Sequence, residues 1–371
     1  MRSEAATFID ALKAPPDCLR TQGPELSPHN LVPRLSHFCE HGDSNRGPSM
    51  TPTSAATAFD PSAIAEARAK VNHGLATLSA VVVGKEVQVR RALAVLLSGG
   101  HVLVEDLPGV GKTTLAKGLA RLLGGSFQRV QGTNDLLPSD LLGVHLWDTE
   151  TKTFRFQQGP VFCNVLLLDE LNRIGPKTQS ALLEVMVEGQ VTLDRSSHQL
   201  PDPFFVIATQ NPMDHAGTFP LPESQLDRFA CVLHLGYPDP VNERKVITGQ
   251  AGAERLDGLQ ASLDLADWRA ARLAVRRMKV SDAVLDYVER VVSRIRNGGG
   301  FCSTRAVRHW VALSQAEAWL EAREFITPDD LQATLSDVMA HRGTMDDRRL
   351  NRGERRDQLA RVLVETPVGW K

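Results

Sequence analysis

The stretch 102–120 limits the possible folds of this chain more than any other part. It starts with a short apolar run and passes through two closely spaced glycines, Gly109 and Gly111, into an apolar pattern of helical spacing that begins near Lys112. The glycines let the backbone curl so that successive N–H groups face one point, and such a nest binds anions. The N-terminal end of a helix adds positive partial charge there. The stretch therefore predicts a buried strand, a phosphate-binding loop and a helix.

Roles within this loop follow from the chemistry of a bound triphosphate. The ammonium group of Lys112 reaches the β- and γ-phosphates, and the hydroxyl of Thr113 is placed to bind Mg²⁺. The strict pattern G-x-x-x-x-G-K-[ST] has glycine where this chain has Asp106, so we expect a loop of a variant type. A chance glycine turn before a helix is the alternative. The residues expected at the nucleotide are Pro108, Gly109, Val110, Gly111, Lys112, Thr113 and Thr114.

Composition argues against several other classes of protein. The 371 residues carry a net charge of -2, which disfavours a nucleic-acid coat or a protein of membrane surfaces. The five cysteines lie far apart and form no C-x-x-C pair, which disfavours a disulfide framework or a cysteine zinc site. No apolar run approaches the length of a membrane span, and the N-terminus lacks an apolar signal core. We expect a soluble, cytoplasmic protein.

The pattern along the chain predicts three parts. Residues 1–57 are rich in proline without apolar periodicity, which predicts a disordered leader. Because Met50 lies just before the globular pattern, it is a candidate natural start, which would make most of the leader non-native. Residues 58–240 alternate apolar runs with helical patterns and predict an α/β nucleotide-binding core. Residues 241–371 show apolar spacing of three and four, which predicts a smaller all-α lid domain.

Within the core, five stretches predict strands of a parallel sheet, and the apolar run 164–168 is typical of a central strand that is buried on both faces. These stretches are 101–105, 127–131, 164–168, 204–209 and 231–235. Helices are expected at 61–73, 86–97, 112–120 and 177–188, a short helical turn at 134–143, and hairpins around 154–156 and 191–200. Further helices are expected at 243–250, 265–277, 282–296, 304–323 and 327–341.

An acidic pair, Asp169 and Glu170, follows directly on one of these runs. Acidic groups at the carboxyl end of a parallel strand stand where open α/β sheets bind ligands. We expect Asp169 to hold Mg²⁺ and Glu170 to polarise a water for attack on the γ-phosphate. Asn211 follows the next predicted strand. Either it orients that water or touches the γ-phosphate, or it was selected for the turn before Pro212.

Taken together, these motifs resemble the MoxR family of AAA+ ATPases. The matching stretches are 84–86, 105–113, 136–140, 159–162, 168–173, 177–184, 208–212 and 221–229. The resemblance runs from about residue 61 to the C-terminus, and the ordered set is far more specific than any one motif. It implies a P-loop AAA+ core with a parallel sheet, followed by the helical lid. It also implies that Asn211 is the first sensor of the γ-phosphate.

The resemblance assigns roles that spacing alone does not. Arg228 would be an arginine finger that reaches the nucleotide of a neighbouring subunit, which implies a ring, with six subunits expected, whereas a salt bridge at the surface is the alternative. Arg305 would be the second sensor, reaching the γ-phosphate from the lid, with an ordinary lid charge as the alternative. Val83 and Gly84 would border the adenine. The segment 136–156 resembles the insertion in the second helix that marks this clade and its magnesium-chelatase relatives.

The function that follows is Mg²⁺-dependent ATP hydrolysis coupled to the remodelling of a protein client. The resemblance implies chaperone-like maturation of protein complexes or insertion of metal cofactors, often with a separate partner that carries a von Willebrand A-type domain. A nucleic-acid motor is one rival, disfavoured by the net charge and by the lack of a recognisable reader module. A non-enzymatic nucleotide-dependent scaffold is the other, and it would be expected to lack Glu170, Asn211 or Arg228.

Overall fold

The computed structural model describes residues 61–371 except 108, 194–195, 212–216, 343–351 and 370–371. The predicted leader at 1–57 and the predicted nucleotide contact Pro108 lie outside the described residues. Residues 58–371 form one compact unit. The boundary predicted at 240/241 stays a prediction, since the predicted core and lid both belong to this unit.

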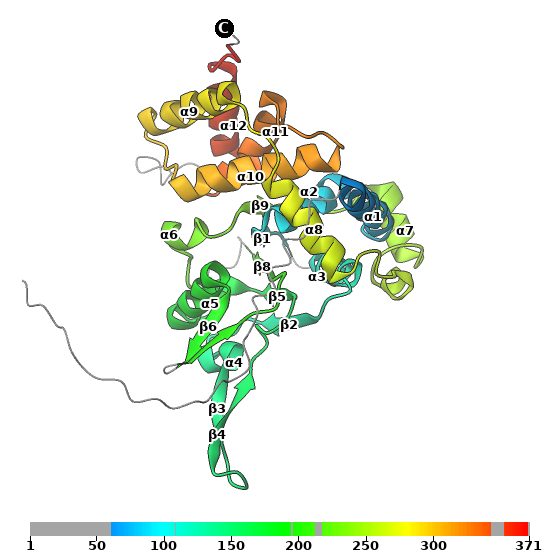
Figure 1. The fold of residues 1–371 in the computed structure, drawn as a ribbon, viewed down its shortest axis with the longest axis vertical. Helices are drawn as coiled ribbons and strands as arrows, with labels where there is room; N and C mark the ends of the chain where they lie inside the picture. The colour runs from blue at the N-terminus through cyan, green and yellow to red at the C-terminus, as the bar shows by residue number, and fades with distance from the viewer. Residues whose placement is uncertain (1–60, 108, 194–195, 212–216, 343–351, 370–371) are drawn as a thin grey trace, which may run out of the picture. The chain divides into compact units, whose positions relative to one another are not determined.

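A five-stranded parallel sheet forms the centre of this unit (Figure 1). Its strands are β1 (Val102–Glu105), β2 (Phe127–Gln131), β5 (Val165–Asp169), β8 (Phe205–Gln210) and β9 (Cys231–Leu233), in the spatial order β2-β5-β8-β1-β9. Every neighbouring pair in this sheet is parallel. The α/β fold with a parallel sheet is therefore confirmed, and each of the five predicted stretches overlaps one of its strands, to within two residues at each end.

Alternate residues of the central strands belong to two separate hydrophobic cores, one on each face of the sheet. Val102 and Val104 of β1 pack into the first core, whereas Leu103 packs into the second. Strands β5 and β8 divide in the same way. Such strands must be apolar at every position, which is why they are continuous apolar runs in the sequence.

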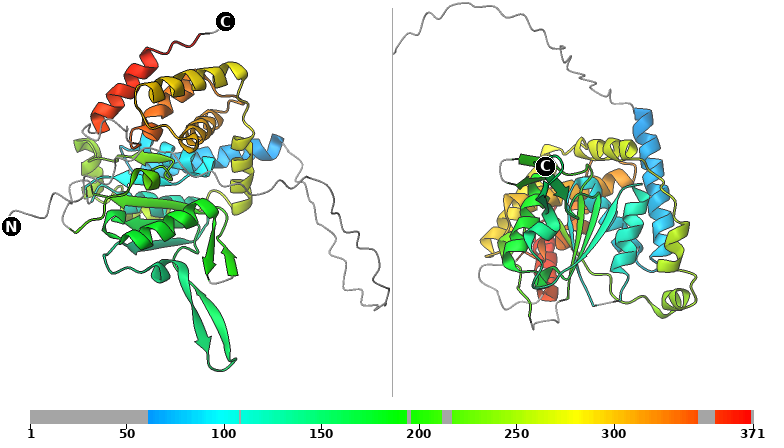
Figure 2. Two further views of the ribbon diagram at one scale, coloured as in Figure 1. Left: turned by 90° about the vertical axis from the view of Figure 1, so that its left-hand side faces the viewer. Right: turned by 90° about the horizontal axis from the view of Figure 1, so that it is seen from below.

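Helices cover both faces (Figure 2, right). The first core includes residues of α1 (Pro61–Val81), α2 (Glu86–Ser98) and α3 (Lys112–Leu122), and the second includes residues of α4 (Pro138–Leu142) and α5 (Pro176–Glu188). Helix α1 is longer than the predicted 61–73. Its apolar spacing continues through the buried Leu78 to Val81, so the run 81–83 closes this helix and starts the next turn.

Two antiparallel hairpins extend from the second face (Figures 1 and 2). The longer pairs β3 (Gly143–Asp148) with β4 (Thr153–Gln158), and the shorter pairs β6 (Gln190–Leu193) with β7 (Ser196–Gln199). The rings of Phe156 and His198 stack with centroids 4.0 Å apart and so join the two hairpins. Both predicted hairpins are present, and the longer one overlaps the segment 136–156 predicted as the helix-2 insertion and ends two residues beyond it.

The lid is helical throughout the part that the structure describes. After the short α6 (Glu223–Leu226), the chain forms α7 (Pro240–Ile247), α8 (Leu265–Arg276), α9 (Asp282–Asn297), α10 (Thr304–Leu320), α11 (Pro328–Met339) and α12 (Arg352–Val364). Two short 3-10 helices, η1 (Leu171–Arg173) and η2 (Ala253–Gly258), complete the set. Helix α12 was not predicted. No described helix is long and apolar enough to cross a bilayer.

The lid packs against the core through apolar and ionic contacts. Helix α10 lies on α2, and α8 lies on α1. Arg91 of α2 bonds Glu317 at 2.6 Å and Asp337 at 2.9 Å, and its side chain is almost fully buried. Removing one partner of such a buried ionic group leaves the other uncompensated, so this contact fixes how α10 and α11 meet the core.

Stability should fall in mild acid because His101 is buried as a neutral ring. Its Nε2 lies 3.0 Å from the Met186 carbonyl oxygen, and its Nδ1 accepts from the Val206 N–H at 3.1 Å, so the neutral ring satisfies both groups. Burial lowers the pKa of His101 from 6.5 to about 4. Since the unfolded chain binds the proton first as pH falls, this stability is complete above pH 6.5 and is lost towards pH 4. We expect a loss of about 2 kcal/mol at pH 5 from this ring.

Urea unfolding at pH 7.5 and pH 5 measures this loss. The control is His101→Gln, whose amide has one acceptor and one donor group but no titration in this range. It should show a shallower pH dependence than the parent. Equal slopes for the two proteins would contradict the assignment of this pH dependence to His101.

Candidate functional site

The loop between β1 and α3 has the backbone that its glycines predict. Gly109 has a φ of 84° and Gly111 a φ of 98°, both in the left-handed region that favours glycine. No heavy atom lies within 4 Å of a Cβ built at either position, so backbone conformation rather than crowding requires glycine. Val110 between them is 7% exposed and belongs to the first core. The loop is thus anchored by Val110.

Asp106 explains how this variant loop is held. Its Oδ2 accepts hydrogen bonds from the backbone N–H groups of Leu235 and Gly236, the latter at 3.1 Å, so the carboxylate joins the end of β1 to the segment after β9. Its carbonyl oxygen accepts from Lys112 Nζ at 3.1 Å. A glycine could not make the side-chain contact. The departure from the strict pattern therefore adds an anchor and leaves the glycine turn intact.

A cavity of about 330 Å³ opens at the carboxyl ends of the central strands. It is lined by Gly109, Gly111, Lys112, Thr113, Thr114, Arg129, Gln131, Asp169, Glu170, Thr209 and Asn211. The structure thus brings together five of the predicted loop residues, the predicted acidic pair and the predicted Asn211, whereas the predicted contact Val110 packs into the first core and does not line the cavity. Ligands of open α/β sheets bind at this edge, where loops from several strands converge.

Asp169 lines this cavity and is 7% exposed. Its Oδ1 accepts from the hydroxyl of Thr209 at 3.2 Å, and its Oδ2 lies 2.7 Å from Nε of Arg129. The hydroxyl of Thr113 lines the same cavity. One carboxylate and one hydroxyl, with phosphate oxygens and waters as the other ligands, form the oxygen donor set that Mg²⁺ prefers, so these residues fit the ion.

Glu170 is held in an unusual backbone conformation. Its φ is 59°, and its N–H donates to the hydroxyl of Thr209 at 3.0 Å. Its Oε2 accepts from Nε2 of Gln131 at 2.8 Å and lies 3.0 Å from Nε of Arg173. Non-glycine residues keep positive φ only where their surroundings impose it, and such residues are concentrated at functional sites. Thr209 thus positions both members of the acidic pair.

Electrostatics make the cavity suited to an anion. Burial lowers the pKa of Lys112, while the negative charges of Asp169, Asp106 and Glu170 act in the opposite direction. The helix N-terminus adds positive partial charge at the same point. Burial removes part of the water that would solvate the Lys112 ammonium group. An anion bound between Lys112 and the N-terminus of α3 would stabilise the positive charge of this group instead.

Two predicted residues lie outside the cavity lining, in a second cluster. Arg305 bonds Asp227 Oδ2 at 3.3 Å, and Arg342 bonds Asp227 Oδ1 at 2.9 Å. Arg342 also donates to the carbonyl oxygen of Phe229 at 2.7 Å. Arg228 lies between Asp227 and Phe229 in the sequence, and its Nε is buried without a hydrogen-bond partner among the described residues. The carboxylate of Asp227, the residue that precedes Arg228, is therefore engaged by Arg305 and Arg342.

Val83 and Gly84 also lie away from the cavity lining. They form the turn between α1 and α2, where the Gly84 N–H donates to Glu86 at 3.3 Å. The side chain of Asn242 in α7 comes within 2.8 Å of a Cβ built on Gly84. The predicted adenine contacts of Val83 and Gly84 stay a prediction.

Three residues of the cavity were not predicted: Arg129, Gln131 and Thr209. The first two belong to β2, which is the edge strand of the sheet, and they contact the acidic pair. A signal was present in the sequence. β2 is polar at alternate positions, unlike the other strands, and such alternation places Arg129 and Gln131 on one face.

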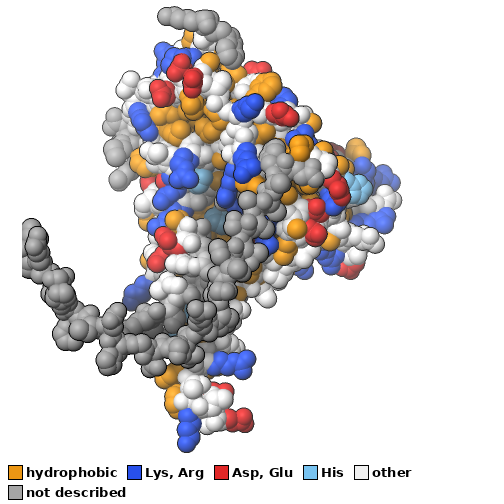
Figure 3. Space-filling model, viewed as in Figure 1, with side chains coloured by type: hydrophobic (Ala, Val, Ile, Leu, Met, Phe, Trp, Pro, Cys, Tyr) orange, Lys and Arg blue, Asp and Glu red, His pale blue; other side chains and the backbone are white. Residues whose placement is uncertain are grey.

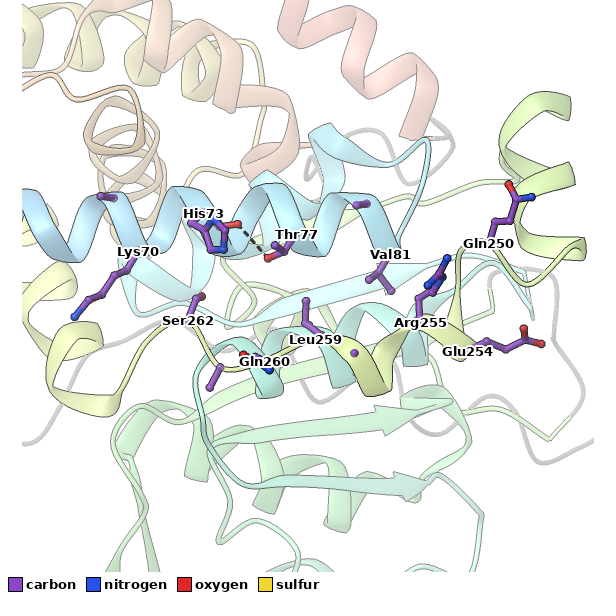
Figure 4. Close-up of a pocket in the computed structure, with 14 residues that line it drawn as sticks. Lys70, His73, Thr77, Val81, Gln250, Glu254, Arg255, Leu259, Gln260 and Ser262 are labelled. Carbon is purple, nitrogen blue, oxygen red and sulfur yellow. Dashed lines mark hydrogen bonds between the residues drawn. The ribbon is translucent and has the colours of Figure 1, made fainter.

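A larger groove of about 940 Å³ lies elsewhere, between α1 and the segment 250–262 (Figure 4). It is lined by residues such as Lys70, His73 and Thr77, and by no residue of the phosphate loop. Lys70 is already paired with Asp267 at 2.9 Å. The groove is thus separate from the phosphate loop, and size alone does not mark the candidate site.

A parallel sheet of this order, a phosphate loop after β1, an acidic pair after β5 and a helical lid together define an AAA+ ATPase. The comparisons agree: residues 101–231 match the model "ATPase family associated with various cellular activities (AAA)", and residues 299–362 match "AAA lid domain".

The relatives narrow the class. The chain is 41% identical over 268 residues to YeaC of Bacillus subtilis, covering 71% of this chain and 84% of that protein. It is 38% identical over 274 residues to Chaperone MoxR1 of Mycobacterium tuberculosis, covering 71% and 72%. A crystal structure of a candidate ATPase from Cytophaga hutchinsonii superposes with a TM-score of 0.72 at 31% identity, covering 81% of this chain and 96% of that one. The chain belongs to the MoxR family of AAA+ ATPases.

Proposed function

We propose that this protein hydrolyses ATP in a Mg²⁺-dependent reaction. The observation that carries the proposal is the single cavity lined by Lys112, Thr113, Asp169, Glu170 and Asn211. Lys112 and the N–H groups of the loop would bind the β- and γ-phosphates, while Thr113 and Asp169 would hold Mg²⁺. When bound, the ion supplies charge neutralisation between the β- and γ-oxygens.

In this proposal Glu170 accepts a proton from the attacking water. To do so its carboxylate must turn from Gln131 and Arg173, both at hydrogen-bond distance, towards the water. Asn211 would orient the same water or contact the γ-phosphate from the end of β8. Thr209 keeps the backbone of Glu170 and the carboxylate of Asp169 in register with one another.

The arginine cluster supports action between subunits. Arg228 and Arg305 do not line the cavity of their own chain, and Arg305 bonds Asp227, the residue next to Arg228. We assign Arg228 to the nucleotide of a neighbouring subunit in a ring, for which six subunits is the size that the family resemblance suggests. An arginine supplied in this way neutralises charge on the transferring phosphoryl group and makes hydrolysis depend on assembly. Arg305 keeps its predicted role as the second sensor, which reaches the γ-phosphate from the lid.

The work driven by hydrolysis would be remodelling of a protein client. A relative that is 38% identical is named as a chaperone, which supports a chaperone-like role in complex maturation or metal-cofactor insertion. A separate von Willebrand A-type partner and a cytoplasmic location stay predictions. Figure 3 shows Lys/Arg and Asp/Glu side chains interspersed on one face, whereas a nucleic-acid motor needs a basic track.

Lys112→Ala tests the proposed site. It removes the one ammonium group of the cavity, so affinity for ATP should fall about ten- to a hundredfold, the effect of losing a charged hydrogen bond. Isothermal titration with ATP and Mg²⁺ measures binding, and phosphate release measures turnover, which EDTA should abolish in the parent. Lys117→Ala, an exposed lysine of the same helix, is the matched control. Unchanged binding and turnover in Lys112→Ala would refute the site.

A further inference from the structure

Arg129 is the charged residue of the cavity that the proposed reaction leaves without a role. We propose that Arg129 is a positioning residue that competes with Mg²⁺ for Asp169, and so sets how much Mg²⁺ the nucleotide site requires. This inference rests on the proposed function, because it concerns the same cavity. It adds that an arginine of the same chain, bound to the proposed metal ligand Asp169, helps to determine the Mg²⁺ requirement of that site.

The geometry places Arg129 directly on the metal ligand. Its Nε lies 2.7 Å from Asp169 Oδ2, while Asp169 Oδ1 accepts from Thr209 at 3.2 Å. Both oxygens of the carboxylate are therefore engaged by protein groups. Asp169 is 7% exposed, and both Asp169 and Arg129 line the cavity. A cation or its bound water that approaches Oδ2 therefore competes with the guanidinium group for this oxygen.

The side chain of Arg129 is less constrained by its surroundings than a fully buried arginine. Its side chain is 50% exposed and comes from the edge strand β2. By contrast, the side chain of Arg342, which holds Asp227 in the second cluster, is 0% exposed. A half-exposed ion pair is weakened by solvent and exchanges its partner readily, whereas a buried one leaves an uncompensated charge when it breaks. The Arg129–Asp169 pair therefore suits a reversible contact.

The released guanidinium has a second partner close by. Arg129 lines the same cavity as Lys112 and Thr113, so after leaving Asp169 it stays near the position proposed for the phosphates. Guanidinium groups bind phosphate oxygens well because their donors form a planar fork. Arg129 would thus exchange one anionic partner for another as metal and nucleotide enter together.

Replacement of Arg129 by methionine should lower the Mg²⁺ requirement. Without its competitor, Asp169 is free to bind the ion. We expect the Mg²⁺ concentration for half-maximal binding of a fluorescent ATP analogue to fall at least about threefold, or about 0.7 kcal/mol. Without nucleotide, Arg129→Met should unfold at a lower temperature than the parent because Asp169 loses its partner. The difference in unfolding temperature between variant and parent should be smaller when Mg²⁺ and the analogue are both present at saturating concentrations.

Two further variants make the test decisive. Arg155→Met removes an exposed arginine of β4, outside the cavity, and should leave the Mg²⁺ midpoint unchanged. Arg129→Lys keeps the charge without the fork and should shift the midpoint in the same direction by a smaller factor. An unchanged or raised midpoint in both Arg129 variants would overturn the inference. If the parent fails to bind the analogue at any Mg²⁺ concentration, the proposed function itself fails.

Discussion

Arg228→Ala should abolish hydrolysis while leaving the protein folded and able to bind ATP. Arg228 does not line the cavity of its own chain, so its loss removes no contact with that chain's nucleotide. An arginine finger contributes about 10³–10⁵ to the rate of phosphoryl transfer, and we expect a loss in that range. Phosphate release measures turnover, and titration with ATP measures binding. Arg308→Ala, an exposed arginine of α10, is the matched control.

Mixing distinguishes action between subunits from action within one chain. A ring that contains both Arg228→Ala and Glu170→Gln subunits has some cavities with an intact Glu170 beside a neighbour with an intact Arg228. With equal amounts and random order in a closed ring, about a quarter of the sites should be complete. Co-expressed mixtures should therefore recover about a quarter of the parent turnover. No recovery at any ratio, in rings shown by mass to be mixed, would remove the support for action in trans.

Glu170→Gln should bind ATP and fail to turn it over. The amide keeps the size of the side chain and its contact with Gln131, but it cannot accept the proton of the attacking water. General bases contribute about 10²–10⁴ to such rates, so turnover should fall by that factor. ATP affinity should stay within about twofold of the parent, because the loop contacts are unchanged.

The matched control for this variant is Glu184→Gln, an exposed glutamate of α5 that removes the same charge elsewhere. It should keep parent turnover. Normal turnover by Glu170→Gln would show that another group is the base. Weakened ATP binding would instead show that Glu170 contributes to the binding of ATP before the reaction. A stable, ATP-bound Glu170→Gln protein would also serve to capture client proteins, which bears on the biological role.

The parts of the fold that were predicted correctly are those that local chemistry determines. The central strands β1, β5 and β8 are apolar except at their carboxyl ends because both of their faces are buried, and this shows in the sequence without knowledge of the neighbours. The loop was predicted because Gly109 and Gly111 need left-handed backbone. The acidic pair was placed at the cavity because the carboxyl ends of parallel strands meet at one edge.

What was missed depends on contacts between distant residues. Asp106 was noted only as a departure from a pattern, since its bonds to Leu235 and Gly236 cross about 130 positions of the chain. Likewise, the pair of Arg129 with Asp169 spans 40 positions and becomes visible only when β2 lies beside β5. Helix α12 was missed because it begins with charged residues and has little apolar periodicity. These features follow from tertiary structure and not from local pattern.

The bonds of Arg342 have a mechanical consequence. Arg342 follows α11 in the lid, yet it grips the residues on both sides of Arg228, through the carboxylate of Asp227 and the carbonyl oxygen of Phe229. A tilt of α11 would therefore move the segment that carries Arg228. In the ring proposed above, the orientation of α11 in one subunit would then control ATP hydrolysis in the adjacent subunit.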